Sequence, residues 1–329
     1  MTRPRIGFLG VGWIGRHRMQ AMLETGLVEA AAIADPSPEM IAEAMKLAPR
    51  AHVVDGLASM LATGVDGVVI ATPSALHAEQ SVAALQAGAA VFCQKPLGRD
   101  AAEAARVVDA ARTADRLLSV DFSYRFTAGM QAIRELVANG ALGHVQAIDL
   151  VFHNAYGPDK PWFYDRAQSG GGCVMDLGVH LVDLALWALG FPEGDPEVTA
   201  QLFANGRLLA PGAEAVEDFA TASIVLPMGT VVRLTCSWRL HAGRDAEIAA
   251  AFYGTGGGAA LRNVDGSFYD FVAERYHGTQ RETLAMPPEE WGGRAGADWA
   301  RRLAAGERFD PAAAQLVTVS QVLDRIYGR

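Results

Sequence analysis

The sequence predicts an α/β protein of two domains. We expect a doubly wound parallel sheet over residues 1–122, and over residues 123–329 an α/β domain built on a large, mostly antiparallel open sheet. Three observations lead to this prediction. The chain has 329 residues, which is too long for one small core. Short apolar runs alternate with helical patterns up to residue 122, whereas β-rich runs dominate the later part of the chain.

The elements of the first domain follow from this alternation. Short apolar runs predict strands that are covered on both faces, as in a parallel sheet. We expect such strands at 6–9, 28–34, 52–54, 65–71, 89–93 and 117–122. The intervening patterns predict helices that end near residue 22 and then span 38–47, 56–62, 75–87 and 100–113. Strands joined in this way by short loops and helices form a doubly wound sheet.

The second domain begins with a helix at 128–139, which ends at Gly140. β-rich runs then occupy 144–153, 198–209, 215–226, 230–240 and 247–253. A turn at 227–229 joins two of these runs as a hairpin. Asp310 and Pro311 are a cap and a first-turn proline for a last helix at about 311–327. Most of these runs have no helix between them, so they predict one large, mostly antiparallel sheet.

The composition is that of a soluble globular protein. Half of the residues are hydrophobic, and the formal charge of −9, without a basic stripe, argues against nucleic acid as a partner. No apolar run approaches the roughly 20 residues that span a membrane, and the apolar start is too short for a signal peptide. Cys93, Cys173 and Cys236 are too widely spaced to form a disulfide framework or a metal motif. We therefore expect a cytoplasmic protein without a bound metal.

A glycine pattern after the first strand predicts a dinucleotide site. Gly10, Gly12 and Gly15 form G-x-G-x-x-G between a strand and a helix. These glycines allow a tight turn, close approach of a pyrophosphate, and close packing of helix on strand. Free N–H groups and the helix dipole then hold the phosphates, so Trp13 and Ile14 also belong to the predicted site.

Asp35 makes this site specific for NAD. It follows Gly15 by 20 residues, at the end of the second apolar run. A carboxylate there accepts hydrogen bonds from both ribose hydroxyls of an adenosine and repels a 2′-phosphate. The alternative is a structural glycine turn beside a surface aspartate.

A second signal lies at 161–190, where three glycines precede a helix that is apolar nearly all round and therefore buried. Its ionisable residues Asp176, His180 and Asp183 are spaced i, i+4, i+7 and are expected on one face. An imidazole suits general-base work on a hydroxyl, with a carboxylate fixing its tautomer. We interpret Asp176 and His180 as catalytic. A structural Asp–His hydrogen bond is the alternative, and Asp183 is the weakest of the three candidates.

Lys95 is the other catalytic candidate, because it ends a parallel strand where ligands of such sheets bind. The chain has only three lysines among 28 basic residues, and lysine, unlike arginine, can lose its proton when desolvated. An ordinary surface lysine is the alternative. Thr72 and Pro73 end the neighbouring strand and should line the cofactor, together with Gln94. His77 is assigned to the same site, although a structural role is open.

Three residues of the second domain are candidates for substrate binding. Tyr124 and Arg125 begin the domain, and Arg125 either anchors a ligand oxygen or ties the domains together. Trp162 could stack on a sugar ring, but aromatic residues of this kind also serve packing.

These motifs, in order, resemble those of the glucose–fructose oxidoreductase/inositol dehydrogenase (Gfo/Idh/MocA) family. The resemblance rests on GVGWIG, Asp35, TPSALHAE, QKP at 94–96, YRF at 124–126 and GGGCVMDLGVHLVDL. It implies a Rossmann domain followed by an α/β domain whose open sheet pairs copies into homodimers or homotetramers. It also implies that Lys95 is the lysine of the family's Glu-Lys-Pro motif, which often precedes a cis proline. Asp176 and His180 fall on the Asp and His of the family's catalytic helix.

Two departures affect the predicted site. Gln94 replaces the family's Glu, so Lys95 is expected to lack a neighbouring carboxylate and to deprotonate more easily. Ser123 and Tyr124 replace an Asn before the Arg-Phe element, which changes the substrate wall.

The predicted function is NAD-dependent oxidation of a hydroxyl of a sugar, an inositol-like polyol or a related secondary alcohol. His180 takes the hydroxyl proton, Asp176 orients His180, and Lys95 polarises the reacting oxygen while it contacts the nicotinamide ribose of the cofactor. Hydride transfer itself is the chemistry of the cofactor. The alternatives are reduction of a carbonyl by the same family and a non-catalytic NAD-sensing regulator.

Overall fold

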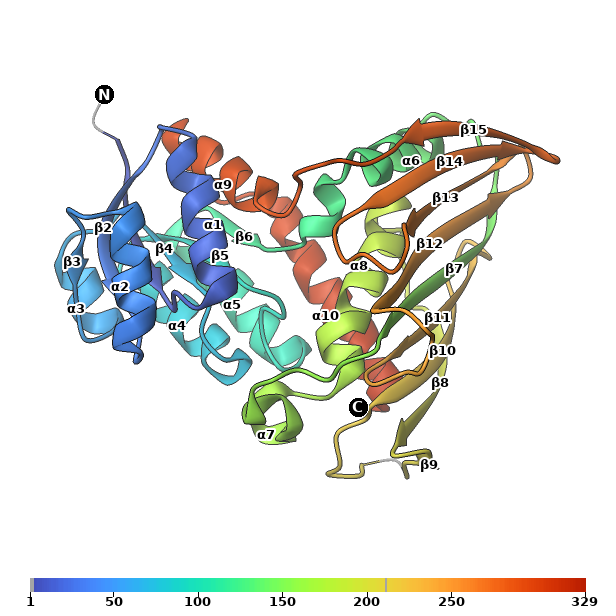
Figure 1. Ribbon diagram of the computed structural model, residues 1–329, viewed down its shortest axis with the longest axis horizontal. Coiled ribbons are helices and arrows are strands. Elements are labelled where there is room, and N and C mark those ends of the chain that lie inside the picture. The colour runs from blue at the N-terminus through green and yellow to red at the C-terminus, as the bar shows by residue number, and fades with distance from the viewer. Residues whose placement is uncertain (1–2, 211) are drawn as a thin grey trace. The chain divides into compact units, whose positions relative to one another are not determined.

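The computed structural model describes residues 3–210 and 212–329, which form two compact units (Figure 1). The first unit contains the chain up to Ser123 together with Gly292–Thr318. The second unit contains Tyr124–Trp291 and Val319–Arg329. The sequence division at residue 123 did not foresee that residues 292–318 group with the first unit.

The first unit is built on a six-stranded sheet in the order β3-β2-β1-β4-β5-β6. All of its strand pairs are parallel. The strands are β1 (Arg5–Leu9), β2 (Glu29–Ala34), β3 (His52–Val53), β4 (Gly67–Ile70), β5 (Ala90–Cys93) and β6 (Leu118–Val120). Every residue of β4 and β5 is buried, as their apolar runs predict for central strands. The expected doubly wound parallel sheet is confirmed.

Five helices connect these strands in chain order, and Figure 1 draws them in blue and cyan. They are α1 (Trp13–Glu24), α2 (Pro38–Leu47), α3 (Leu57–Ala62), α4 (Ser74–Gln86) and α5 (Ala101–Ala114). Side chains cap two of them, because Ser37 accepts from Met40 N and Asp100 accepts from Glu103 N. The N-cap residue of α1 is Gly12, which has no side chain, so α1 begins without a side-chain hydrogen bond to its first N–H groups.

A helix that the sequence analysis did not predict completes the first unit. α9 (Arg294–Ala304) packs against α1, and its Trp299 is fully buried against Phe92 of β5. A Cβ at Gly67 would lie 2.8 Å from the Trp299 ring, so the start of β4 has no room for a larger residue. This close packing gives a physical reason for the return of residues 292–318 to the first unit.

The second unit is built on a nine-stranded sheet in the order β15-β14-β13-β12-β7-β11-β10-β8-β9. Its strands are β7 (Val145–Asn154), β8 (Glu197–Ala204), β9 (Arg207–Leu208), β10 (Phe219–Val225), β11 (Val231–Ser237), β12 (Ala246–Gly254), β13 (Gly258–Asn263), β14 (Phe271–His277) and β15 (Gln280–Ala285). Every pair is antiparallel except β11 with β7. The expected open, mostly antiparallel sheet is confirmed, but β13 to β15 were not predicted.

The helices of the second unit cover one face of this sheet. α6 (Ala128–Ala138) packs on β13 to β15, and α8 (Val179–Ala188) packs on β7 and β11. Figure 1 also shows the short α7 (Arg166–Ser169) and the last helix, α10 (Ala314–Tyr327). The stretch Arg166–Ala188 is long and apolar enough to cross a membrane, but its apolar window is 94% buried inside the protein. The segment is therefore better explained as a core helix.

Candidate active site

The glycine turn of the first unit has the geometry expected of a phosphate-binding loop. Gly10 has a φ of +83°, and a Cβ there would lie 2.5 Å from the Ala71 oxygen. A Cβ at Gly15 would lie 2.1 Å from the Gly10 oxygen. Because glycine has no Cβ, the helix can approach the strand closely here. A Cβ at Gly12 would meet no atom within 4 Å. The space beside Gly12 is thus open at the uncapped start of α1, where backbone N–H groups favour an anion.

Asp35 follows β2 and faces this turn. Its Oδ2 accepts from Val11 N at 2.8 Å, and its Oδ1 accepts from Ser37 N at 2.9 Å. The two backbone N–H groups hold the carboxylate at the glycine loop, and its contact with a ribose stays a prediction. Together with the open space at Gly12, this arrangement fits a bound dinucleotide.

The other residues expected at the cofactor border the same turn or follow the adjacent strand. Thr72 N would lie 3.0 Å from a Cβ at Gly10, so the Thr72–Pro73 segment lies against the glycine turn. Thr72 Oγ1 donates to Gln80 Oε1, and Pro73 occupies the position before α4 without a side-chain cap. Trp13 is 57% exposed at the start of α1, and Ile14 is half-buried. The ligand contacts of these residues stay predictions.

His77, assigned to the predicted cofactor site with a structural role left open, is buried between two loops. Its side chain is 1% exposed, and its ring nitrogens lie 2.6 Å from the Pro96 oxygen and 2.7 Å from the Thr72 oxygen. Burial lowers the pKa of His77, and the two carbonyl oxygens oppose that shift. The imidazole holds together the two loops that follow β4 and β5, so a structural role explains it better than direct contact with a cofactor.

Lys95 follows β5 in the second of these loops and is half-buried. The peptide bond between Lys95 and Pro96 is cis, as the resemblance implied. The strand order places β4 and β5 side by side, so Thr72 and Lys95 follow neighbouring strands at the carboxyl edge of the sheet. Ligands of open parallel sheets bind at that edge.

A carboxylate that the sequence analysis missed lies beside Gln94. Asp121 follows β6, is 1% exposed, and accepts from Gln94 Nε2 and Arg18 Nε, each at 2.6 Å. Ser123 Oγ donates to the same carboxylate at 2.8 Å. A carboxylate therefore lies beside Gln94, and it is paired with Arg18. The expectation that Lys95 has no neighbouring carboxylate stays a prediction.

Asp176 and His180 occupy special positions on the core helix of the second unit. A π-helical turn, Val174–Gly178, leads into α8. Between residues 171 and 188, Asp176 and His180 are half-exposed and all other residues are buried. The predicted apolar helix is confirmed, and these two polar side chains are the ones in that range that are partly exposed to solvent.

Asp183, the third ionisable residue predicted on this helix face, differs from the other two because it is fully buried. It is 1% exposed and forms a bidentate ion pair with Arg125, whose Nε lies 2.8 Å from Oδ2. Burial raises the pKa of Asp183, and the Arg125 guanidinium offsets part of that shift. The guanidinium also lies over the rings of Trp187 and Phe191. Arg125 thus stabilises the second unit from within, and its predicted contact with substrate is not tested by this geometry.

One aromatic side chain contacts Asp176 and another contacts His180. The indole nitrogen of Trp238, which is 4% exposed, donates to Asp176 Oδ2 at 3.1 Å. The Tyr124 ring packs edge-on against the His180 ring, with centroids 5.0 Å apart. Trp162 stacks on Phe163, with centroids 3.8 Å apart. Trp238 was missed because nothing local in the sequence connects it to Asp176, 62 residues away.

The cysteines are buried, and their placement gives no nucleophile. Burial raises the pKa of Cys93 to about 12, which keeps the thiol protonated. Cys173, the residue before the π-helical turn, and Cys236 are far apart in sequence, but their sulfurs lie 3.8 Å apart. Across residues 3–210 and 212–329, no cluster of His, Cys, Asp or Glu is placed to hold a metal ion.

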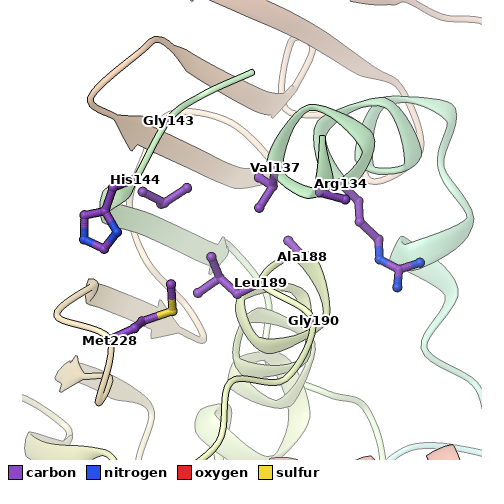
Figure 2. Close-up of a pocket in the computed structure, with 10 residues that line it drawn as sticks. Arg134, Val137, Gly143, His144, Ala188, Leu189, Gly190 and Met228 are labelled. Atoms are coloured by element: carbon purple, nitrogen blue, oxygen red, sulfur yellow. The ribbon is translucent and has the colours of Figure 1, made fainter. Parts of the chain in front are cut away.

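A surface pocket of about 350 Å³ lies elsewhere in the second unit (Figure 2). It is lined by the ends of α6 and α8, the start of β7 and the β10–β11 turn, including Arg134, His144, Leu189 and Met228. No residue of the predicted site lines it. Asp176 and His180 lie toward the opposite end of the core helix, so this pocket is not assigned to the chemistry.

Comparisons with known proteins agree with the two halves of this description. Residues 4–122 match an oxidoreductase family with an NAD-binding Rossmann fold, and residues 130–260 match the Gfo/Idh/MocA C-terminal domain. A putative UDP-kanosamine synthase oxidoreductase subunit of Amycolatopsis mediterranei (strain S699) is 32% identical over 276 residues, covering 78% of this chain and 75% of that protein.

Two further relatives show the range of the similarity. The D-glucoside 3-dehydrogenase of Escherichia coli (strain K12) is 31% identical over 217 residues, which are 63% of this chain. The match spans 62% of that enzyme, less than two thirds of its length. A solved structure of levoglucosan dehydrogenase with NADH and levoglucosan has a TM-score of 0.84 at 22% identity, covering 99% of this chain and 97% of that one. At that identity the structural match supports the fold.

Proposed function

We propose that this chain, which belongs to the Gfo/Idh/MocA family of oxidoreductases, oxidises a hydroxyl of a sugar or an inositol-like polyol with NAD. One observation carries the proposal. In the buried range 171–188, the half-exposed residues are one carboxylate, Asp176, and one imidazole, His180. A buried helix that keeps this pair accessible has the groups needed to remove a proton from an alcohol.

Each catalytic residue has a role that its chemistry allows. His180 accepts the hydroxyl proton of the substrate, and Asp176, held by the Trp238 indole, orients the imidazole. Lys95 donates a hydrogen bond to the reacting oxygen, which stabilises the negative charge that develops there. A nicotinamide held by this chain would supply the hydride acceptor, while His180 would take the hydroxyl proton as the alcohol is oxidised to a carbonyl.

The first unit supplies the binding site for the dinucleotide. Gly10, Gly12 and Gly15 would hold the pyrophosphate at the start of α1, and Asp35 would accept both adenosine ribose hydroxyls. The carboxylate would repel the 2′-phosphate of NADP, so we assign NAD as the preferred cofactor. We further infer a cytoplasmic location from the reduced, buried cysteines.

We also propose that the protein forms a homodimer or homotetramer through the sheet of the second unit. In Figure 1, α6 and α8 lie on one face of this sheet. The opposite face carries small half-exposed side chains on adjacent strands, among them Ala147, Val151, Ala249 and Ala251. The same face carries the Asp149–Arg233 ion pair between these small side chains, and a surface of this mixed kind suits pairing with a second copy. Sedimentation of the purified protein at micromolar concentration checks the assignment, and a monomer would contradict it.

The test of the proposed activity is a panel of aldoses, inositols and sugar acids incubated with NAD, with reduced cofactor followed by absorbance. His180→Asn should abolish most of the turnover. His144→Asn is the matched control, because His144 lies at the surface pocket and outside the proposed site. If no alcohol reduces NAD but carbonyl sugars oxidise NADH, the enzyme acts as a reductase. If the panel gives no turnover in either direction while NAD binds, the protein is a sensor rather than an enzyme.

A further inference from the structure

The start of the core helix in the second unit is buried, and its backbone N–H groups need partners there. Residues 171–175 are all buried, so water cannot satisfy these donors. The first N–H groups of a helix have no partner within the helix itself, and an unpaired buried N–H costs about 1–3 kcal/mol. The partners of residues 172–175 therefore determine how this segment is held.

A single loop residue, Glu217, receives three of these four groups. Its carboxylate accepts from Gly172 N at 2.9 Å and from Val174 N at 3.0 Å, and its backbone oxygen accepts from Cys173 N at 3.0 Å. Glu217 is 2% exposed, although it lies just before β10 in a loop whose neighbours are mostly half-exposed or exposed. A carboxylate in such surroundings is costly unless donors surround it, as they do here.

The fourth group is held from the last helix. Met175 N donates to Tyr327 Oη at 3.1 Å, and the Tyr327 hydroxyl in turn donates to Glu217 Oε1 at 2.7 Å. Tyr327 is the last residue of α10 and is 8% exposed. Glu217 and Tyr327 together therefore satisfy the four N–H groups immediately before Asp176.

The glycines of this segment are explained by the same contacts. A Cβ at Gly171 would lie 2.0 Å from Tyr327 Oη, and a Cβ at Gly172 would lie 1.9 Å from the Glu217 oxygen. Both distances are too short for any side chain. Glycine at 171 and 172 therefore allows the Glu217 loop and α10 to reach the backbone of the helix start.

We infer that Glu217 and Tyr327 are positioning residues that set the direction of Asp176 relative to His180. The inference rests on the proposed function, since it assigns these two residues to the catalytic pair. Asp176 lies in the π-helical turn 174–178, which contains one residue more per hydrogen-bonded ring than an α-helix. If the turn relaxed to α-helix, residues before it would rotate about the axis by about 100°, the angle of one residue.

The amides held by Glu217 and Tyr327 are those that resist this rotation. Val174 and Met175 form the first two positions of the π-helical turn, and Asp176 is the third. Their N–H groups are directed to acceptors on a loop and on a distant helix, 43 and 152 residues away in sequence. The position of the Asp176 carboxylate thus depends on contacts outside its own helix.

Glu217→Gln and Tyr327→Phe test the inference with little change in volume. The matched controls are Glu274→Gln and Tyr276→Phe, because Glu274 is also a buried carboxylate of this unit that accepts from a tyrosine hydroxyl, Tyr276 at 3.1 Å. We expect both test variants to lower kcat for sugar oxidation about tenfold or more, because a shift of about 1 Å at a reacting group can cost about 10²-fold. The dissociation constant for NAD should change less than about twofold, since these residues lie outside the unit that carries the glycine turn. Both controls should keep kcat within about twofold of the wild type even if they melt at lower temperature.

Amide hydrogen exchange gives a readout that needs no substrate. Peptides that cover residues 170–178 should exchange at least about tenfold faster in Glu217→Gln than in the wild type. In Glu274→Gln their exchange rate should equal that of the wild type. Unchanged exchange in Glu217→Gln would overturn the inference, and so would a kcat equal to that of the controls. If the wild type oxidises no sugar, the proposed function fails, whereas the exchange result still decides whether Glu217 holds the segment.

Discussion

Replacing Gln94 by glutamate should destabilise the first unit, even though glutamate is the residue that the family resemblance implies at this position. In the wild type the Gln94 amide donates to the buried carboxylate of Asp121 at 2.6 Å. The Gln94→Glu substitution would place a second carboxylate against the first one. Two carboxylates at such a distance cannot both stay ionised without a large cost, so the pair would take up a proton. Arg18, which bonds to Asp121 at 2.6 Å, offsets only part of the repulsion.

The size of the effect follows from the cost of that proton. Protonating a carboxyl with an ordinary pKa of about 4.3 costs about 3.7 kcal/mol at pH 7 and about 1 kcal/mol at pH 5. Proton uptake therefore limits the loss in the free energy of unfolding to about 4 kcal/mol at pH 7. The pair binds its proton at higher pH in the folded than in the unfolded chain. The stability of the variant relative to wild type should thus rise as the pH falls from 7 to 5.

Urea unfolding of Gln94→Glu and the wild type at pH 7 and pH 5 measures this difference. Gln168→Glu is the matched control, because Gln168 also donates to an aspartate, Asp165 at 2.7 Å, but is exposed. That change should cost less than about 1 kcal/mol at either pH. Adding Asp121→Asn to Gln94→Glu should recover more than half of the loss, since one carboxylate then remains beside Arg18. A Gln94→Glu variant as stable as wild type at pH 7, or one with a pH-independent loss, would refute the reasoning.

Four further predictions concern the proposed site. The wild type should prefer NAD over NADP clearly in kcat/KM, because the Asp35 carboxylate held by Val11 N repels a 2′-phosphate. Asp35→Ala should narrow this preference. Equal use of both cofactors by the wild type would contradict the prediction. Lys95→Met should lower kcat about 10²-fold or more with little loss of NAD affinity, and near-normal turnover would exclude electrostatic catalysis by Lys95. His180→Asn should fold, bind NAD and lose about 10²–10⁴-fold in turnover, whereas a lower melting temperature with normal turnover would indicate a structural imidazole. Burial raises the pKa of Glu217 above 4.5, so the stability that this group contributes should fall as the pH rises through its folded pKa. In Glu217→Gln the unfolding free energy should therefore change less with pH in the acid range than in the wild type. An unchanged pH dependence would contradict this sign.

The parts of the fold that the sequence predicted are those whose signal is local. Apolar runs such as 65–71 and 89–93 became the fully buried strands β4 and β5. The helix that is apolar all round became the buried α8, and the glycine turn lies between β1 and α1 as expected. In each case the pattern of one segment is sufficient, because burial on both faces or a required turn leaves its mark on adjacent residues.

The elements that were missed depend on their neighbours. β13 begins at a glycine, and β15 is a polar strand whose first four residues are exposed, so neither has a strong strand pattern of its own. Each is held by pairing with adjacent strands of the same sheet. α9 follows two glycines and carries three arginines, and its burial is decided by Trp299, which packs on Phe92. Tertiary contacts of this kind override weak local propensity.

The candidate site divides in the same way, and the division has a functional meaning. The groups proposed to meet a ligand, such as Asp35, Lys95 and His180, follow motifs and were identified from sequence. The groups that hold them were not: Asp121 bonds to Arg18 across 103 residues, and Tyr327 bonds to Glu217 across 110 residues. Each supporting group is a buried polar side chain whose partners come from other segments, so no periodic pattern marks it. A buried carboxylate is tolerated only when donors surround it. The cost of burying Asp121 and Glu217 is therefore itself a sign that they fix the backbone and side chains around the proposed site.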